Sequence, residues 1–360
     1  MNRKKFLTSV TVASVGAAVF PSSILGQPSK SQNRDFEGLL KDEPAVIKPP
    51  KLKKGDRIAL VTPGSYISEK ELQESIKNLD DLGFEVTFSK RLMLQNGYFS
   101  GKDKERAEDL MEMFERSDVD GIMCARGGYG CARILPLLDY DIIRSNPKVL
   151  IGYSDITALL YGIFNKSGLI TFHGPVSIST FNEFSVSNFN RVLINPEPST
   201  KVLNADGNDD KNIYGVTSLV SGRGKGRLIG GNLSIMVSLI GTEYDVDYSN
   251  KIIFIEEIGE EPYRVDRMLT QLIQARKFEN ASGVMMGIFD KCEPKEKEPA
   301  YGKSFTLMEV LKDRLGNLKI PVVYGMSFGH IKNKFTIPFG ALAELDSDKQ
   351  TFTLLEKAVN

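Results

Sequence analysis

The sequence predicts an α/β fold: a parallel sheet with helices on both faces, followed by a smaller C-terminal domain of mixed α/β structure. Three observations support this prediction. Short apolar runs alternate with amphipathic stretches from about residue 55 onward. A polar stretch at residues 181–213 interrupts this pattern, and the last segments have the character of antiparallel strands. A chain of 360 residues is also long enough for roughly two domains.

The first domain is expected at residues 51–180. Its apolar runs are short and separated by stretches of helical periodicity, as in a sheet of buried parallel strands with crossover helices. The expected strands are residues 57–62, 84–89, 121–125, 148–152 and 169–173, and the expected helices are 69–82, 104–116, a stretch ending near 144 and one starting near 155. The motifs PGS, RGGYG, GYSD and HGP follow strands, and ligands bind beyond the carboxyl ends of such strands.

The second domain is expected at residues 214–360, after a linker at 181–213. Its apolar and amphipathic stretches again alternate, and its end, with FTIPFGALAELD and TFTLLE, is typical of antiparallel strands. The expected strands are residues 251–257, 283–289 and 320–326, and the expected helices are one that opens at 230–232, 262–275 and 305–315.

Residues 1–26 have the layout of a secretory signal peptide. Arg3, Lys4 and Lys5 precede an apolar stretch of small residues that is too short for a transmembrane anchor. The start also resembles a twin-arginine signal, with Lys4 in place of the second arginine. Residues 27–50 are polar and contain proline, as expected of a tether. We therefore expect export to the periplasm without stable membrane insertion after signal removal; the alternative, a disordered and unprocessed tail, predicts a cytoplasmic protein.

Composition and motifs exclude several classes of function. Basic and acidic residues balance at 46 each, and no nucleic-acid-binding signature is present, so we expect no nucleic-acid partner. The three cysteines form no C-x-x-C pair, which argues against a disulfide framework. Two histidines and no H-E-x-x-H argue against a histidine-rich zinc site, no Walker loop is present, and without G-x-G-x-x-G we expect no nicotinamide site.

Ser154 is the first candidate for catalysis. In KVLIGYSDITALLYGIF, it lies between an apolar run and a helical stretch, where a strand-to-helix turn presents a hydroxyl at the sheet edge. The N–H of Asp155 would then be free to stabilise an oxyanion, and a glycine of RGGYG is a candidate for the second N–H. The motif G-Y-S-D differs from G-x-S-x-G, however. A helix cap made by Ser154 or Asp155, and a purely structural RGGYG turn, therefore remain alternatives.

A serine nucleophile needs a base and an acid that orients the base. The base must be His173 or His330. His330 lies in a Gly-flanked loop and is the stronger candidate, whereas His173 ends a strand and is a candidate structural or substrate contact. The acid is expected in FIEE, where alternation places Glu256 and Glu257 on opposite faces of a strand, one solvated and one directed into the cleft.

Five motifs in the same order resemble those of LD-carboxypeptidases, the muramoyltetrapeptide carboxypeptidase family of serine peptidases, which also includes microcin C self-immunity proteins. The motifs are RGGYGCARILPLLD, IGYSDITALL, GRLIGGNLS, FIEEIGEEPYRVDRMLTQL and FGH with a later PFG. The resemblance covers residues from about 51 to 355. It implies that Ser154 is the nucleophile, Glu256 the orienting acid and His330 the base.

The resemblance also implies an oxyanion hole made by the N–H groups of Asp155 and of Gly127 or Gly128, with Gly128 favoured. The implied reaction removes the terminal D-alanine from a murein tetrapeptide, without a metal or cofactor, at a site between two domains and often in a homodimer. Arg126 is a candidate for binding the terminal carboxylate, and a structural salt bridge is the alternative for it.

The signal-like start departs from the best-known family members, which act on recycled cytoplasmic muropeptides. It predicts an exported enzyme that acts on periplasmic peptidoglycan stems or on imported fragments. Two other functions remain: a peptidase of the microcin-immunity type that cleaves a peptidyl-nucleotide, and a non-catalytic exported solute-binding protein.

Overall fold

The computed structural model describes residues 45–205, 215–295 and 300–360. The chain divides into two units, Met1–Glu43 and Pro44–Asn360, and every element described below belongs to the second. The predicted signal peptide and the first part of the tether lie outside the described residues. The end of the tether belongs to the fold, because Ile47 pairs with Leu169 and donates its N–H to Gly168 O at 2.9 Å.

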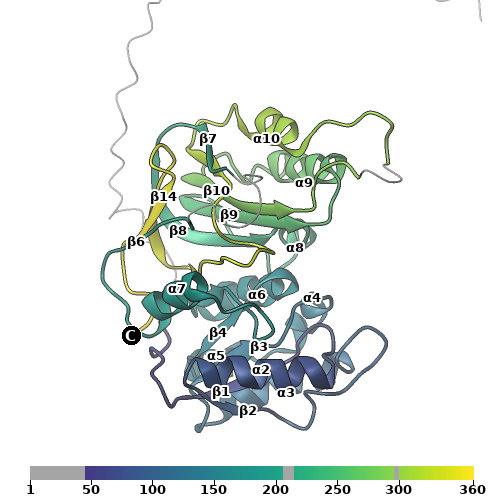
Figure 1. The fold of residues 1–360 in the computed structure, drawn as a ribbon, viewed down its shortest axis with the longest axis vertical. Coiled ribbons are helices and arrows are strands. Elements are labelled where there is room, and N and C mark those ends of the chain that lie inside the picture. Colours follow the sequence, from purple (N-terminus) through teal and green to yellow (C-terminus); the bar gives the residue numbers. More distant parts are fainter. Residues whose placement is uncertain (1–44, 206–214, 296–299) are drawn as a thin grey trace, which may run out of the picture. The chain divides into compact units, whose positions relative to one another are not determined.

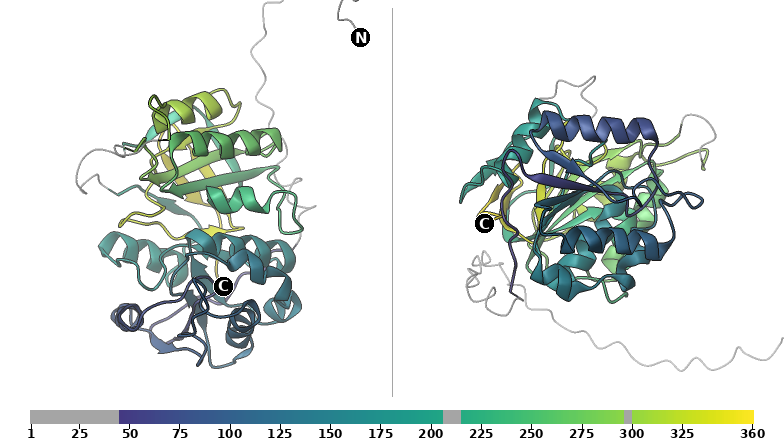
Figure 2. Two further views of the ribbon diagram at one scale, coloured as in Figure 1. Left: turned by 90° about the vertical axis from the view of Figure 1, so that its right-hand side faces the viewer. Right: turned by 90° about the horizontal axis from the view of Figure 1, so that it is seen from below.

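The first sheet has six strands in the order β12-β5-β4-β3-β1-β2. Strands β1 to β4 are labelled in Figure 1. Five of the six strands are parallel, and β12 joins the edge antiparallel to β5. The strands are β1 (Arg57–Val61), β2 (Glu85–Thr87), β3 (Gly121–Cys124), β4 (Val149–Gly152), β5 (Thr171–His173) and β12 (Ile337–Phe339); the helices are α2 (Glu69–Asp81), α3 (Asp103–Glu115), α4 (Cys131–Ile134), α5 (Tyr140–Ser145) and α6 (Thr157–Ser167). Figure 2 shows helices on both sides of this sheet, which confirms the predicted architecture.

The second sheet is mixed, with eight strands in the order β6-β14-β13-β8-β9-β10-β11-β7. Its four central strands, β8 to β11, are parallel, and antiparallel strands flank them on both sides. The strands are β6 (Thr200–Val202), β7 (Thr217–Val220), β8 (Arg223–Asn232), β9 (Lys251–Ile258), β10 (Gly283–Asp290), β11 (Val322–Tyr324), β13 (Leu342–Asp346) and β14 (Thr351–Leu354); the helices are α8 (Leu233–Leu239), α9 (Pro262–Gln274) and α10 (Leu307–Leu315). Within the described residues, no helix has the length and apolar character needed to cross a membrane.

Strand β8 was not among the expected strands. Its sequence, RGKGRLIGGN, contains four glycines, and glycine disfavours strand interiors because it has no side chain to pack. Partner strands on both sides override this local preference, since β8 pairs with β9 and with β13. The predicted helix at residues 230–232 instead begins at Leu233, after the side chain of Asn232 has accepted a hydrogen bond from the N–H of Ile235.

The segment expected to be a linker, residues 181–213, contains a helix and a strand in its described part. Helix α7 (Glu183–Leu193) starts at Asn182, whose side chain accepts from the N–H of Ser185, and β6 joins the second sheet. The chain also returns to the first sheet late, because β12 pairs with β5. Helix α7 and strand β6 were not expected. Strand β12 lies in FTIPFGALAELD, where antiparallel structure was expected, but its pairing with β5 was not, because the two strands are distant in the sequence.

The two sheets meet where the end of β8 lies against the start of α6, a helix that also packs on β5 (Figure 1). Gly231 has a φ of 147°, and a Cβ at this position would lie 2.6 Å from Cγ2 of Thr157. The next residue, Asn232, donates its N–H to Thr157 Oγ1 at 3.0 Å. Only glycine permits this close approach with this backbone conformation.

We expect Gly231→Ala to destabilise the protein by about 1–3 kcal/mol, because the added methyl group must push α6 away from β8. Urea unfolding measures this change. Gly215→Ala is the matched control, since a Cβ at Gly215 meets nothing within 4 Å. Equal effects of the two substitutions would contradict the proposed importance of this contact.

Candidate active site

Ser154 lies on a sharp turn between β4 and α6. Its φ of 65° is in the left-handed region, which is uncommon for a residue other than glycine and is concentrated at functional sites. A 3₁₀ turn, Ser154–Ile156, follows before α6 begins at Thr157. The N-cap positions of these two starts are Tyr153 and Ile156, and the hydrogen bond recorded for the Ser154 side chain is with His330. The helix-cap alternative therefore does not describe this serine.

The hydroxyl of Ser154 lies instead beside His330. Its Oγ is 3.1 Å from His330 Nε2, and His330 Nδ1 is 2.7 Å from Glu256 Oε2. Glu256 is on β9 of the second sheet and is 0% exposed. These distances fit a chain in which Nδ1–H donates to the carboxylate and Nε2 accepts from the serine hydroxyl. The structure thus brings together the three residues that the sequence singled out.

Gly329 lets the His330 loop approach the buried acid. Its φ is 109°, and a Cβ there would lie 3.1 Å from Glu256 Cβ. The ring of Tyr153 packs edge-on against His330, with the two ring centroids 4.8 Å apart. The imidazole is therefore held from two sides, by a carboxylate and by an aromatic ring.

The expectation that one of the paired glutamates is solvated is wrong, because Glu257 is only 2% exposed. Its carboxylate accepts hydrogen bonds from the side chains of Asn232 and Ser234 and from two backbone N–H groups, at 2.6–3.0 Å. Burial raises the pKa of Glu257, and these donors oppose that rise. Glu257 therefore secures the start of α8, whereas Glu256 alone contacts the histidine.

The RGGYG loop lies directly against the turn that carries Ser154. A Cβ on Gly127 would be 2.9 Å from Ser154 Cβ and 3.2 Å from the backbone nitrogen of Asp155. Gly128 has a φ of 92° and packs on Ser65, so it also requires the absence of a side chain. Among the described residues, neither Gly127 nor Gly128 donates its N–H to an acceptor. Both are therefore available to a ligand beside Ser154.

The side chain of Asp155 has a second role that sequence reasoning missed. Its buried carboxylate accepts from the N–H of Cys131 at 2.9 Å, just after the RGGYG loop. Burial raises the pKa of Asp155, and the bond from Cys131 opposes this effect. At the other end of the loop, Gly127 O accepts from Ser65 N at 3.1 Å. The glycine loop is thus fixed to the serine turn and to the loop after β1.

Ser154 and His330 open into a cavity of ≈ 510 Å³. Arg126, Gly127, Gly128, Tyr153, Val176, Ile178, Ser179, Thr180, Ile258, Ile331, Lys332 and Lys334 complete its lining. Arg126 also forms a salt bridge of 3.3 Å with Glu71, so both readings of this residue have a geometric basis.

His173 does not line this cavity. It is 2% exposed and packs against the rings of Tyr153, Phe254 and Phe328. Burial lowers the pKa of His173 to about 4, which keeps the ring neutral. It lies beneath the site as a core residue and offers no surface to a ligand in the cavity.

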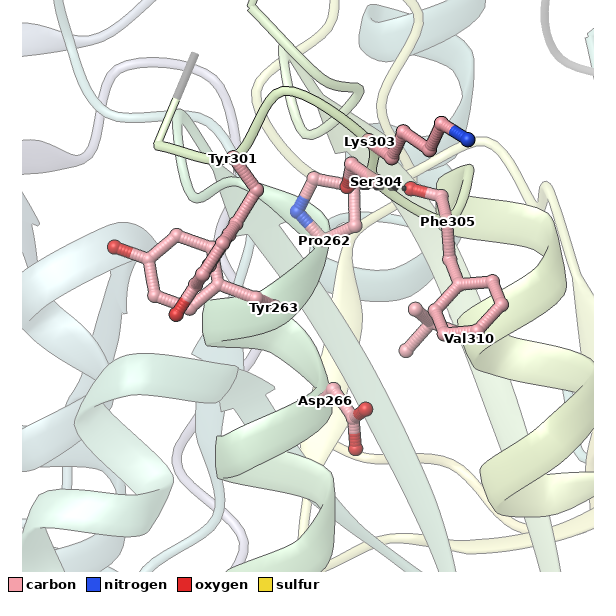
Figure 3. A pocket seen from close by; sticks show the side chains of 8 residues that line it. All are labelled: Pro262, Tyr263, Asp266, Tyr301, Lys303, Ser304, Phe305 and Val310. Atoms are coloured by element: carbon pink, nitrogen blue, oxygen red, sulfur yellow. Dashed lines mark hydrogen bonds between the residues drawn. The ribbon is translucent and has the colours of Figure 1, made fainter.

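A second cavity, of ≈ 340 Å³, lies between α9 and α10 (Figure 3). Its lining comprises Pro262, Tyr263, Asp266, Tyr301, Lys303, Ser304, Phe305 and Val310. Its serine donates to the carbonyl oxygen of Phe305 at 2.9 Å and has no histidine beside it in this lining. In residues 45–205, 215–295 and 300–360, no cluster of three or more His, Cys, Asp or Glu side chains is arranged to hold a metal ion. Of these two cavities, the one at Ser154 has a serine paired with a histidine in its lining.

Comparison with known proteins gives two family matches. The LD-carboxypeptidase N-terminal domain matches residues 58–174, and the LD-carboxypeptidase C-terminal domain matches residues 225–345. The chain is 36% identical over 310 residues to the probable murein peptide carboxypeptidase of Bacillus subtilis (strain 168), which covers 84% of this chain and 93% of that protein. These findings confirm the resemblance inferred from the motifs.

Two further matches are a second curated relative and a solved structure. The chain is 30% identical over 348 residues to the microcin C7 self-immunity protein MccF of Escherichia coli, with 89% of this chain and 98% of that protein covered. The crystal structure of muramoyltetrapeptide carboxypeptidase from Oxalobacter formigenes is similar with a TM-score of 0.69 and 30% identity, covering 83% of this chain and 97% of that one.

A fluorophosphonate, which phosphonylates activated serines, tests the site without any assumed substrate. We expect labelling of Ser154 in the wild type and none in Ser154→Ala. His330→Ala should label about 10²–10⁴-fold more slowly, because the base that removes the hydroxyl proton is gone. Peptide mass spectrometry locates and quantifies the label.

Ser304→Ala is the matched control, since this serine lies in the second cavity without a histidine, and its labelling should equal that of the wild type. Equal labelling rates in the wild type and His330→Ala would show that the histidine does not activate Ser154.

Proposed function

We propose a specific reaction for this chain, which belongs to the LD-carboxypeptidase family and is a serine carboxypeptidase-like hydrolase. The reaction is removal of the terminal D-alanine from murein tetrapeptides in peptidoglycan turnover or recycling. The observation that carries the proposal is the hydrogen-bonded series Ser154, His330 and Glu256 at the wall of the cavity. The printed names of the relatives from Bacillus subtilis and Oxalobacter formigenes support the substrate class.

In the acylation step, His330 Nε2 takes the proton of Ser154 as Oγ attacks the carbonyl carbon of the diamino acid at position three. Glu256 accepts the Nδ1–H bond throughout, which fixes the tautomer and stabilises the imidazolium. The imidazolium then donates its proton to the amine of the departing D-alanine. Breakage of the C–N bond leaves the tripeptide as an ester on Ser154.

In the deacylation step, water attacks the ester carbonyl while His330 again acts as the base. The proton returns to Ser154 Oγ as the tripeptide leaves with a free carboxylate. Both steps pass through an oxyanion, which the N–H of Asp155 and one N–H of Gly127 or Gly128 would bind. The left-handed conformation of Ser154 and the carboxylate of Asp155 hold these donors in place before substrate arrives.

The relationship to the microcin C7 self-immunity protein makes a peptidyl-nucleotide the second candidate substrate. Ser154, assisted by His330 and Glu256, would attack the acyl group of that substrate by the same mechanism. The two functions therefore differ in substrate and not in mechanism. Export of the protein, proposed from residues 1–26, favours murein peptides because a toxin cleaver would act in the cytoplasm. A non-catalytic solute-binding protein would have no need of the hydrogen-bonded base and acid.

We expect the purified protein to release D-alanine from disaccharide tetrapeptide and to leave tripeptide intact. Ser154→Ala and His330→Ala should each reduce the rate by at least about 10³-fold while the protein stays folded, because these residues act as one unit. Mass spectrometry of tripeptide, tetrapeptide and pentapeptide incubations follows the products, and circular dichroism checks the fold.

A parallel incubation with a peptidyl-nucleotide tests the second candidate. Turnover of that substrate alone would replace the murein proposal. Full turnover of tetrapeptide by both variants would contradict the catalytic roles given to Ser154 and His330.

A further inference from the structure

The charged side chains that line the cavity at Ser154 are all basic. Three cationic side chains line it, those of Arg126, Lys332 and Lys334, and none of its lining residues is Asp or Glu. Cations placed without acidic neighbours favour an anionic ligand, which they bind by charge-assisted hydrogen bonds. A cation that already has an anionic partner contributes less to ligand binding than one without.

Two of the three cations are poorly suited to a specific contact. Arg126 is paired with Glu71 and also donates towards Tyr66 O. Glu71 is fixed in turn by the capping box of α2 with Ser68, so this pair is part of the fold. Lys332 is exposed, and an exposed ammonium is well solvated and gains little from a salt bridge.

Lys334 differs from both because it is buried, at 6% exposed, and none of the described Asp or Glu side chains forms a salt bridge with it. Its ammonium donates to the carbonyl oxygen of Ile331, and its backbone N–H donates to Ser185 Oγ at 3.0 Å. Burial lowers the pKa of Lys334 to about 8, and the charge of Glu256 opposes this effect. A buried ammonium that no carboxylate contacts is costly, so a ligand carboxylate would stabilise it.

The position of Lys334 fits the end of the substrate. Its Nζ lies 5.0 Å from the ring centroid of Tyr153, and the same ring is 4.8 Å from the ring of His330. Tyr153 directly precedes Ser154. In a peptide cut at its last bond, the terminal carboxylate lies only one residue, about 3.5 Å of extended chain, beyond the attacked carbonyl. Lys334 contacts the same aromatic ring as His330 and lines the same cavity as Ser154, so it lies on the side of the site where such a carboxylate would be.

We propose that Lys334 binds the terminal carboxylate of the substrate and thereby makes the enzyme select peptides with a free C-terminus. This inference rests on the proposed carboxypeptidase function and names the residue that limits cleavage to the last bond. Binding of the terminal carboxylate is thus assigned to Lys334 and not to Arg126, whose charge is already compensated by Glu71. The alternative is a structural lysine that only stacks on Tyr153 and donates to Ile331.

The test compares two substrates that differ only at the C-terminus, the tetrapeptide with a terminal D-alanine carboxylate and the same tetrapeptide with a terminal D-alanine amide. The wild type should prefer the acid by about 10- to 100-fold in kcat/KM, as expected for loss of one charge-assisted contact. In Lys334→Met, KM for the acid should rise by a similar factor with little change in kcat, and the preference should fall to about one.

Two further variants distinguish loss of the positive charge from loss of packing. Lys334→Arg keeps the positive charge and should keep most of the preference for the acid, whereas loss of packing would impair both substrates alike. Lys303→Met is the matched control, because this lysine lines the second cavity (Figure 3) and should leave both constants unchanged. Thermal unfolding of each variant shows whether it is folded.

The outcomes separate the two proposals. An active wild type together with an unchanged acid preference in Lys334→Met overturns the role of Lys334 alone. A wild type that releases no D-alanine from either tetrapeptide overturns the proposed function and the inference that rests on it.

Discussion

The site depends on one close contact, in which the backbone of Gly231 at the end of β8 lies against the side chain of Thr157 at the start of α6. Ser154 is three residues before Thr157, and Asn232, beside Gly231, pairs in register with Glu256 on β9. The nucleophile and the orienting acid come from different sheets, and this contact sets the distance between them. His330 then fills the space between the two, so the triad is a product of how the sheets meet.

Two residues of the site, Ser154 and Glu256, are held in states that cost free energy locally. Ser154 has a left-handed backbone, a conformation that costs on the order of 1–3 kcal/mol for such residues. Glu256 is fully buried, and its Oε1 has no hydrogen-bond partner among the described residues. Such features persist only where packing over-determines them, and here β4, β9 and the start of α6 are buried. The same rigidity presents the N–H groups of the glycine loop before a substrate binds.

Much of the fold could be predicted because apolar runs reveal buried parallel strands, as for β1, β3 and β4. Strand β8 could not, because its four glycines disfavour a strand. Antiparallel structure was expected in the segment of β12, but its place in the first sheet could not be predicted, because its partner β5 is more than 160 residues away in sequence. For the site, the count of histidines limited the bases to two, and the motif resemblance chose Glu256 over Glu257. Alternation gave the wrong exposure for Glu257, since the start of α8 covers it. The burial of Lys334 also had no sequence signal, because Lys332 looks the same in the chain.

The central claim is that Ser154 becomes acylated by the part of the tetrapeptide that precedes D-alanine. Acid-quenched samples taken during turnover, analysed by intact-protein and peptide mass spectrometry, measure this most directly. We expect an adduct on the peptide containing Ser154, whose mass increases by that of the tetrapeptide less that of D-alanine. An adduct on another residue, or turnover with no adduct at any quench time even when deacylation is slowed by low temperature, would contradict it.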